Sequence, residues 1–377
     1  MLAGRHRDTE ASRVDLEFQE VLKQIDEDLR PYRLTNITLE MVESSYCSCT
    51  HSSWRLQVVN GSMYVAGEIK PYQTRNESVK RQLLELVRLE GPLPDLDIYF
   101  DSQDHAEYCP LGESEACKVR GPHLQQAKKP ENDHLILIPG PTFGGWPEVK
   151  FSKWVEMQQT MGLAAQQNPW EERDPALFFI GCNLGPQRNV LFDNQEAIRR
   201  DHPEVSINWI CWDDPALVPP VFDFCKHKHL LNVMGSSWSS RAKYLFLCGS
   251  TVVFPDSPFF EFWYRILVNG HNVVRTPAIT RENRGEPMLE AARALLANET
   301  DAKRMADNAW FTGMTTLSPE NLRRYWRRLL TEYAALQTFK PTVHPDAIPL
   351  HLSLSHPKFF LPHERSCDQS VCPRKAH

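Results

Sequence analysis

The sequence predicts an α/β protein with two domains, each built on a parallel β-sheet flanked by helices. The chain has 377 residues, more than one hydrophobic core usually serves, so two packed domains are expected. In both halves, short apolar runs bounded by turn residues alternate with helical or loop segments. This alternation is typical of strands buried between helices in parallel sheets.

The N-terminal part of the chain predicts a helix followed by a β-hairpin. We expect residues 1–14 to be disordered because they are polar, and residues 14–29 to form a helix because their apolar residues recur at helical spacing. The stretch SWRLQVVNGSMYVAGE then alternates around Asn60 and Gly61. An Asn-Gly pair between two alternating runs is a strong hairpin signal.

The next segments predict one helix and two buried strands. SVKRQLLELVRLEG reads as an amphipathic helix that ends at Gly91, and PDLDIYF as a strand that stops at DSQDHAE. Residues 109–133 are polar and contain Pro and Gly, which predicts a loop. HLILIPGPTFGGW follows as a second buried strand that opens into a glycine-containing turn.

The second half repeats this arrangement. Three apolar runs predict further strands: ALFFIGCNLGPQRN, VSINWICW and YLFLCGSTVVF. A long helix is expected from Ser318, which is placed to cap it, with Pro319 at its first position. We expect the apolar face of this helix to consist of Leu322, Trp326, Leu329 and Tyr333.

Composition excludes two classes of protein. Hydrophobic residues make up 41% of the chain, the mean hydropathy is −0.45, and no apolar run approaches the roughly 20 residues of a membrane span. The formal net charge of −6 provides no basic field of the kind that binds nucleic acid. We therefore expect a globular protein with no nucleic-acid partner and no membrane span in this chain.

The cysteines and sequons favour the lumen of the secretory pathway, the endoplasmic reticulum or Golgi. The chain has ten cysteines, none in paired CxxC motifs at zinc-finger spacing, so disulfides are favoured over zinc. Four N-x-S/T sequons point the same way: Asn36, Asn60, Asn76 and Asn298. The first 20 residues are charged and contain no apolar core of a signal peptide, so the signal segment is not visible in this chain.

Four loops are candidates for a binding site, because ligands of open α/β sheets bind beyond the carboxyl ends of strands. They cover residues 101–104, 142–146, 181–188 and 235–241. The loop GCNLGPQR has neither the GxGxxG of a dinucleotide site nor the GK[ST] of a P-loop. Asp101 and Asp104 can belong either to a catalytic site or to a solvated loop, and no third metal ligand is near them in the sequence.

The stretch GSSWSSR can form an anion site. Its glycine and four serines leave backbone N–H groups free, and Arg241 closes the stretch. Backbone amides and a guanidinium together suit a diphosphate. The alternative is an ordinary serine helix cap beside a surface arginine.

The segment HKHLLNVMGSSWSSRAKYLFLCGSTVVFPDSPFFEFWY resembles the nucleotide-sugar-binding segment of glycosyltransferase family 90. That family includes fungal capsule-associated xylosyltransferases and animal protein O-glucosyltransferases of the Rumi type. Its pattern is K-Y-K-Y-x-x-N-x-x-G, a small-residue turn ending in Arg, L-x-x-G-S-x-V and an aromatic segment around an acid. Further matches occur in the family's order, and the resemblance covers most of residues 15–340: DLRPYR, PDLDIYFDSQD, PTFGGW, NPWEERDPALFFIGCNLGPQR and YWRRLLTEY.

The resemblance implies a GT-B-like fold of two Rossmann-like domains facing across a cleft. It gives an N-terminal acceptor and catalytic-base domain over residues 15–165, a nucleotide-sugar-binding domain over 166–318, and a C-terminal helix and tail over 319–377. It also implies a disulfide between Cys225 and Cys248, which flank the nucleotide-binding turn.

The resemblance further implies an inverting, metal-independent transfer of glucose or xylose from UDP-glucose or UDP-xylose to a protein or glycan hydroxyl, with no cofactor. The family's catalytic base falls on Asp104. Its UDP contacts fall on a set of residues in two loops: Cys182, Arg188, Ser236, Ser237, Trp238, Ser239, Ser240 and Arg241. Glu261, the lone acid of PFFEFWY, would take the ribose hydroxyls or would be a capped or solvated residue beside an aromatic core.

Three departures from the family's pattern leave a second interpretation open. Ile180 stands where the family has Arg, Cys182 where it has Ser, and Met234 where it has Arg. The loss of two cations near a diphosphate is compatible with a pseudo-enzyme that keeps the fold and acts as a luminal binding protein. The family's usual luminal retention signal is also missing at the end of the sequence, PRKAH.

Overall fold

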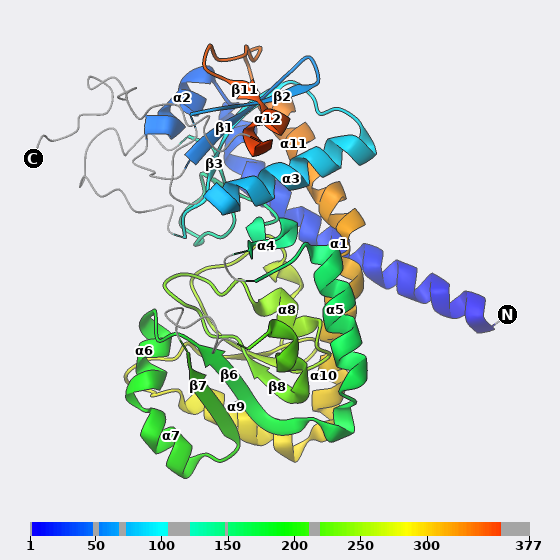
Figure 1. The fold of residues 1–377 in the computed structure, drawn as a ribbon, viewed down its shortest axis with the longest axis vertical. Helices are drawn as coiled ribbons and strands as arrows, with labels where there is room; N and C mark the ends of the chain where they lie inside the picture. The colour runs from blue at the N-terminus through cyan, green and yellow to red at the C-terminus, as the bar shows by residue number, and fades with distance from the viewer. Residues whose placement is uncertain are drawn as a thin grey trace, which may run out of the picture. The chain divides into compact units, whose positions relative to one another are not determined.

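A computed structural model describes residues 2–47, 53–67, 73–104, 121–147, 150–210 and 219–355. The chain divides into two compact units, each discontinuous in sequence. Unit 1 comprises Met1–Val21 and Trp154–Asn321, and unit 2 comprises Leu22–Lys153 and Leu322–His377. Each unit contains one β-sheet (Figure 1), which confirms the predicted α/β class with two sheets. The domain boundaries at residues 165 and 318 stay a prediction.

Unit 2 contains a mixed sheet of six strands in the order β11-β2-β1-β3-β4-β5. Antiparallel pairing joins β1 to β2, β2 to β11 and β1 to β3, whereas β3, β4 and β5 are parallel. The predicted parallel sheet is therefore parallel only in part, because the hairpin and the late strand β11 add antiparallel edges. The strands are β1 Ser53–Val59, β2 Ser62–Ala66, β3 Leu96–Asp101, β4 His123–Gln125, β5 Leu135–Leu137 and β11 Ile348–Pro349.

The predicted hairpin and helices of this unit are present. Asn60 and Gly61 have φ values of 51° and 75°, the left-handed conformations that a tight hairpin turn requires. Ser318 Oγ accepts a hydrogen bond from the N–H of Asn321, and the predicted apolar face of α11 is buried. The helices that lie wholly or partly in unit 2 are α1 Leu2–Thr35, α2 Leu39–Cys47, α3 Gln73–Glu90, α4 Pro141–Gly144, α11 Pro319–Leu336 and α12 Leu350–Ser355.

Unit 1 contains a parallel sheet of five strands in the order β7-β6-β8-β9-β10. Numbered along the chain within the unit, this order is 2-1-3-4-5, the doubly wound order in which connections diverge after strands 1 and 3. The divergence therefore falls between β6 and β8. The strands are β6 Asp174–Gly181, β7 Val205–Trp209, β8 His227–Leu231, β9 Thr251–Pro255 and β10 Val274–Thr276.

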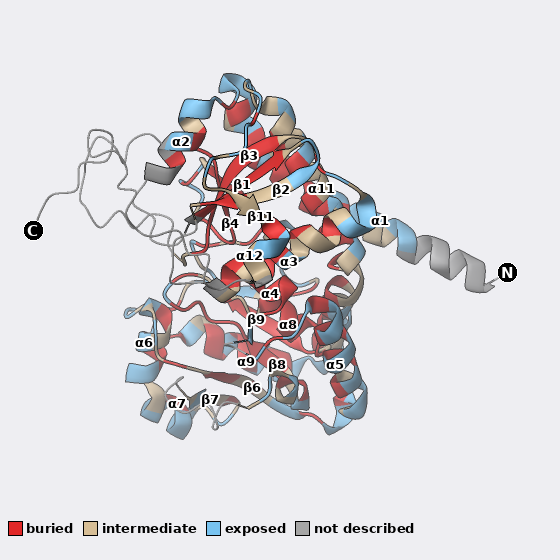
Figure 2. Cartoon of the chain, turned by 45° about the horizontal axis from the view of Figure 1, so that its top comes forward, coloured by how far each residue is buried: buried red, intermediate tan, exposed pale blue. Residues whose placement is uncertain are grey.

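Helices and sheet of unit 1 share one apolar core. It is built from residues of β6, β8 and β9 together with α6, α7, α9 and α10. Figure 2 draws the buried residues of the chain in red. The helices are α5 Trp154–Gln167, α6 Pro186–Asp193, α7 Gln195–Asp201, α8 Ala242–Phe246, α9 Glu286–Ala297 and α10 Glu299–Phe311. Three 3₁₀ helices and one π-helix complete the described elements: Trp170–Glu172, Val221–Lys226, Tyr264–Ile266 and Thr312–Thr316.

Three sequence-based expectations differ from the structure. Residues 2–14 belong to helix α1 rather than to a disordered segment, because their Ala, Glu and Arg residues favour a helix once it is nucleated. The expected loop at residues 109–133 includes β4, while residues 105–120 lie outside the described part. The run YLFLCGSTVVF divides into α8 and β9, with Gly249 at a φ of 59° between them. Apolar content alone does not separate a buried helix turn from a strand.

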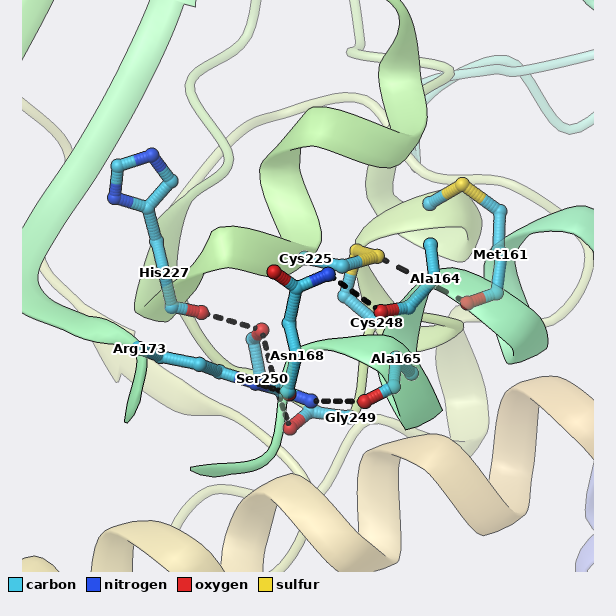
Figure 3. The surroundings of a disulfide bond; sticks show 10 residues. All are labelled: Met161, Ala164, Ala165, Asn168, Arg173, Cys225, His227, Cys248, Gly249 and Ser250. Atoms are coloured by element: carbon cyan, nitrogen blue, oxygen red, sulfur yellow. Dashed lines mark hydrogen bonds between the residues drawn. A yellow bond between two sulfur atoms is a disulfide. The ribbon is translucent and has the colours of Figure 1, made fainter. Parts of the chain in front are cut away.

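Cys225 and Cys248 form a disulfide with a Cα–Cα distance of 4.6 Å, which confirms the predicted pair (Figure 3). Both residues are fully buried. Cys225 and Cys248 each lie a few residues before a strand, β8 and β9 respectively, so the bridge lies near the amino ends of these strands. The loop 235–241 is at the other end of β8. The bridge therefore supports that loop through the strand and not by direct contact.

Arg173 joins the same places without a covalent bond (Figure 3). Its guanidinium donates to the carbonyl of Gly249 at 2.7 Å and to Ser250 Oγ at 3.2 Å. Ser250 Oγ in turn donates to the carbonyl of His227 at 2.7 Å. Arg173 also donates to the carbonyls of Ala165 and Asn168 near the end of α5. One buried side chain thus connects the starts of β8 and β9 with α5.

We expect the double variant Cys225→Ala/Cys248→Ala to fold with a lower free energy of unfolding. A ring with a sequence separation of 23 residues is worth about 3 kcal/mol in the chain-entropy description, whereas the hydrogen bonds of Arg173 remain. Urea unfolding monitored by tryptophan fluorescence measures the difference. An unchanged free energy of unfolding would show that the bridge does not stabilise the fold.

Candidate functional site

The two predicted nucleotide loops follow neighbouring parallel strands. Residues 182–188 follow the carboxyl end of β6, and residues 232–241 follow the carboxyl end of β8. These strands pair directly, with Leu177 opposite His229 and Phe178 opposite Leu230. The structure therefore brings the two loops to one edge of the sheet, at the point where the connections diverge.

Gly185 allows the two loops to touch. Its φ is 108°, and a Cβ atom there would lie 2.0 Å from the carbonyl oxygen of Gly235. No side chain fits at that distance, and the φ value itself favours glycine. Gly185 of GCNLG thus allows a close main-chain approach between the β6 and β8 loops.

Arg188 lies against both loops. Its guanidinium donates to the carbonyl of Val233 at 3.0 Å and to that of Cys182 at 3.3 Å. A Cβ atom added to Gly235 would lie 3.7 Å from the same guanidinium, so the glycine leaves one face of it uncovered by a side chain at that position. Desolvation lowers the pKa of Arg188 to about 10.

Arg241 lies close to the same place. It donates to the carbonyl of Ile180, the penultimate residue of β6. Desolvation, and then the positive charge of Arg188, lower the pKa of Arg241 to about 9. Within the described ranges, no carboxylate acts on the charge of either arginine. Two partly buried guanidinium groups therefore repel each other, and an anion would relieve both the repulsion and the desolvation.

Several buried polar atoms of the same unit have no hydrogen-bond partner among the described residues. They come from the β6 and β8 loops and from the segment after β9: Gln187 Oε1, Arg188 Nε, Asn232 Oδ1, Ser239 Oγ, Arg241 Nη2 and Glu261 Oε1. Buried polar groups in native proteins are normally satisfied. The donors among them, Arg188 Nε and Arg241 Nη2, are what a negatively charged ligand would satisfy, whereas the acceptor oxygens require donors such as hydroxyl groups.

The serine-rich turn is partly buried. Ser237 and Ser239 are buried, Trp238 and Ser240 are intermediate, and Ser236 is exposed. The turn leads into α8, for which Arg241 is the N-terminal flanking residue without a side-chain cap. The alternative of an ordinary serine cap is therefore not what the turn forms.

Glu261 lies deeper than expected. It is 2% exposed, and its Oε2 accepts from Lys243 Nζ at 3.4 Å and from Trp263 Nε1 at 3.3 Å. Burial raises the pKa of Glu261, and the charge of Lys243 opposes that rise. The predicted contact of Glu261 with ribose hydroxyls stays a prediction, and this structure places the carboxylate in the interior beside Lys243.

The positions that depart from the family's pattern are buried. Ile180 is 8% exposed and Met234 6% exposed, so both pack as apolar residues next to the loops. Cys182 is disulfide-bonded and therefore has no thiol hydrogen to donate. Any contact of Cys182 with a ligand would have to use its backbone.

The predicted base lies in unit 2, at the end of β3. Asp104 accepts a hydrogen bond from Arg75 at 2.7 Å, and its side chain is 41% exposed. The same guanidinium donates to the carbonyl of Ser102 and lies 4.7 Å from the ring centre of Trp146 in the PTFGGW segment. Asp101 is buried and accepts from the N–H of Gln103. Of the two acids, Asp104 is the one whose side chain is exposed to solvent.

Two further features concern metal ions and membranes. Within the six described ranges, no group of three His, Cys, Asp or Glu side chains is arranged to hold a metal ion. None of the helices in the same ranges combines the length and the apolar character that crossing a bilayer requires.

Lys243 and Gln187 were not among the residues predicted for this region, and strand β8, which leads into it, was not predicted either. A signal for Lys243 was present. It is a single cation in the apolar run AKYLFL, as Glu261 is a single acid in PFFEFWY, and isolated opposite charges in apolar runs are expected to pair when buried. Gln187 carries no such signal, whereas Asn232 falls on the Asn of the family's K-Y-K-Y-x-x-N-x-x-G pattern.

Comparisons with known proteins agree with the resemblance found in the sequence. The chain is 28% identical to an O-glucosyltransferase rumi of Drosophila pseudoobscura, covering 87% of this chain and 80% of that protein. It is 25% identical to the human Protein O-glucosyltransferase 1, covering 84% and 80%. The Anabaena protein Alr3699/HepE in complex with UDP-glucose aligns over 47% of this chain and 44% of its own, at 12% identity and a TM-score of 0.30. Among protein families, Glycosyl transferase family 90 matches residues 17–358. The chain therefore belongs to glycosyl transferase family 90.

Proposed function

We propose that this protein is an inverting glycosyltransferase that moves glucose or xylose from a UDP-sugar to a hydroxyl group of a protein or glycan. The observation that carries the proposal is the pair Arg188 and Arg241, two partly buried cations without a carboxylate partner among the described residues. A diphosphate supplies the missing negative charge. Relatives named O-glucosyltransferase favour glucose as the donated sugar.

The proposed reaction is a single displacement at the anomeric carbon. The acceptor hydroxyl attacks that carbon and gives its proton to Asp104, while the bond from the carbon to the diphosphate oxygen breaks. Arg188, Arg241 and the backbone N–H groups of residues 236–240 stabilise the charge that develops on the diphosphate. Since cationic side chains perform this stabilisation, the mechanism needs no metal ion, and we expect a chelator to leave turnover unchanged.

A second candidate function is binding without efficient catalysis. It is favoured by Ile180 and Met234, apolar residues at positions where the family has arginine. The two functions differ in one measurement, the hydrolysis of UDP-glucose or UDP-xylose without an acceptor. An enzyme releases UDP slowly under these conditions, and a binding protein releases none. A thermal-shift panel of UDP-sugars would identify the donor in either case.

We also propose that the protein works in the lumen of the secretory pathway. The buried disulfide Cys225–Cys248 is typical of an oxidising compartment. The four sequons differ in structure: Asn36 and Asn60 are exposed, whereas Asn76 is fully buried and accepts a hydrogen bond from Ser102. Asn298 caps α10 through Oδ1, and its Nδ2 donates to Asp301.

Arg241→Ala is expected to weaken UDP binding about tenfold to a hundredfold, because a charge-assisted hydrogen bond is worth roughly 1.5–3 kcal/mol. The loss should appear in the dissociation constant and not only in turnover, since the diphosphate is present in the ground state. Isothermal titration calorimetry with UDP measures it. Arg199→Ala, which removes an exposed arginine of α7, is the control. If Arg241→Ala and wild type bind UDP with equal affinity, the donor site does not include Arg241.

Asp104→Asn should leave UDP affinity nearly unchanged and lower turnover by about 10² to 10⁴, the range of a general base. The asparagine amide oxygen can still accept the hydrogen bond from Arg75, so the substitution removes only the basicity of the carboxylate. Asp101→Asn is the matched control and should cost much less, because that side chain is buried. Steady-state transfer to an acceptor and calorimetry with UDP separate the two effects. An equal loss of turnover in both variants would show that Asp104 is not the base.

The glycosylation pattern of the folded protein tests the luminal assignment. Asn36 and Asn60 should carry glycans when the chain is produced through a secretory route. Asn76 should not, because a glycan cannot be accommodated at a fully buried side chain. Enzymatic deglycosylation in heavy-oxygen water followed by peptide mass spectrometry reports each site. A secreted folded protein with Asn36 and Asn60 both unmodified, or with Asn76 modified, contradicts the expectation.

A further inference from the structure

Lys243 connects the serine-rich turn to the interior of unit 1. It is 0% exposed, its Nζ donates to the carbonyl of Ser240 at 2.9 Å, and the same atom lies 3.4 Å from Glu261 Oε2. Glu261 is held in turn by the indole N–H of Trp263. The lysine thus joins a main-chain oxygen of the turn to a fixed carboxylate beneath it.

Burying this ion pair is costly, so its presence requires a reason other than stability. Replacement of a buried ion pair by apolar residues of similar volume is often neutral or stabilising, while the polar pair selects one geometry. The geometry selected here is the direction of the Ser240 carbonyl. Because a peptide unit is planar and trans, holding that C=O toward the interior turns the N–H of the same peptide, which belongs to Arg241, to the opposite side.

We propose that Lys243 and Glu261 form a positioning pair for the phosphate-binding turn, in which Glu261 fixes the ammonium group and the ammonium group fixes the Ser240 carbonyl. The pair keeps backbone N–H groups and the Arg241 side chain directed at the diphosphate without touching it. The proposal rests on the proposed UDP site and extends it. It also explains how Glu261 can contribute to the site although its carboxylate is buried, since positioning Lys243 requires no contact with the ligand.

The test compares two nucleotides that differ by one phosphate. UDP and UMP are titrated into wild type and into Lys243→Met by calorimetry. If the pair positions the phosphate-binding turn, Lys243→Met binds UDP about tenfold more weakly or worse, and the preference for UDP over UMP falls by the same factor. A purely structural lysine would leave that preference unchanged, because loss of folded protein lowers the apparent binding of both nucleotides alike.

Unit 2 offers a matched control. Lys128 is also buried and also bridges a carboxylate and a main-chain carbonyl, Asp28 at 2.6 Å and Leu135 at 2.7 Å. Lys128→Met should therefore destabilise the protein without changing the UDP-to-UMP preference. If Lys128→Met and Lys243→Met change the preference equally, the proposal is overturned.

A double variant covers the case in which Lys243→Met does not fold. In Lys243→Met/Glu261→Leu both buried charges are absent, so stability should recover, while the preference for UDP should remain reduced. Recovery of both quantities overturns the positioning role. Absence of UDP binding to wild type would instead contradict the proposed function itself. Glu261→Gln titrated with UDP and 2′-deoxy-UDP distinguishes the two roles of Glu261: lost discrimination between these nucleotides indicates ribose contact, and a reduced UDP-to-UMP preference indicates positioning.

Discussion

The parallel pairing of β6 with β8 is the contact on which the proposed anion site depends. It joins two strands whose following connections run in opposite directions, to β7 on one side and to β9 on the other. The loops that begin at their carboxyl ends therefore start side by side and then separate. Gly185 and the main chain at Gly235 set the distance between them. A different neighbour for β6 would leave Arg188 and Arg241 on unrelated parts of the sheet.

The four charged residues in and beside these loops are of two kinds, those paired with an opposite charge and those bound only to carbonyl oxygens. Lys243 and Glu261 neutralise each other inside the protein, and their cost is the desolvation of a closed pair. Arg188 and Arg241 are bound to carbonyl oxygens, which fix their direction but leave their charge. Only the second kind gains from an incoming anion. In the proposed site, Lys243 and Glu261 therefore hold the turn in place, whereas Arg188 and Arg241 provide the affinity for the anion.

Much of the fold could be predicted from local sequence patterns, whereas the candidate site residues come from the resemblance and stay a prediction. The Asn60-Gly61 hairpin, the cap at Ser318 and the buried face of α11 depend on residues near one another in the chain. Strand β8 was missed because HKHLL carries three polar residues on a strand that is nevertheless central. The depth of Glu261 could not be predicted either. It depends on Lys243 and Trp263 packing around it, and periodicity contains no information on such contacts.

The network around Arg173 bears on the order of events during oxidative folding. Its hydrogen bonds reach the carbonyl of Gly249 and, through Ser250, that of His227, and none of them requires an oxidised cysteine. Once β8 and β9 pair, the two thiols are held next to each other at high effective concentration, which favours their mutual oxidation over exchange with the other cysteines of the chain. In this order of events, non-covalent contacts first pair β8 with β9, and the disulfide then forms between cysteines that are already adjacent.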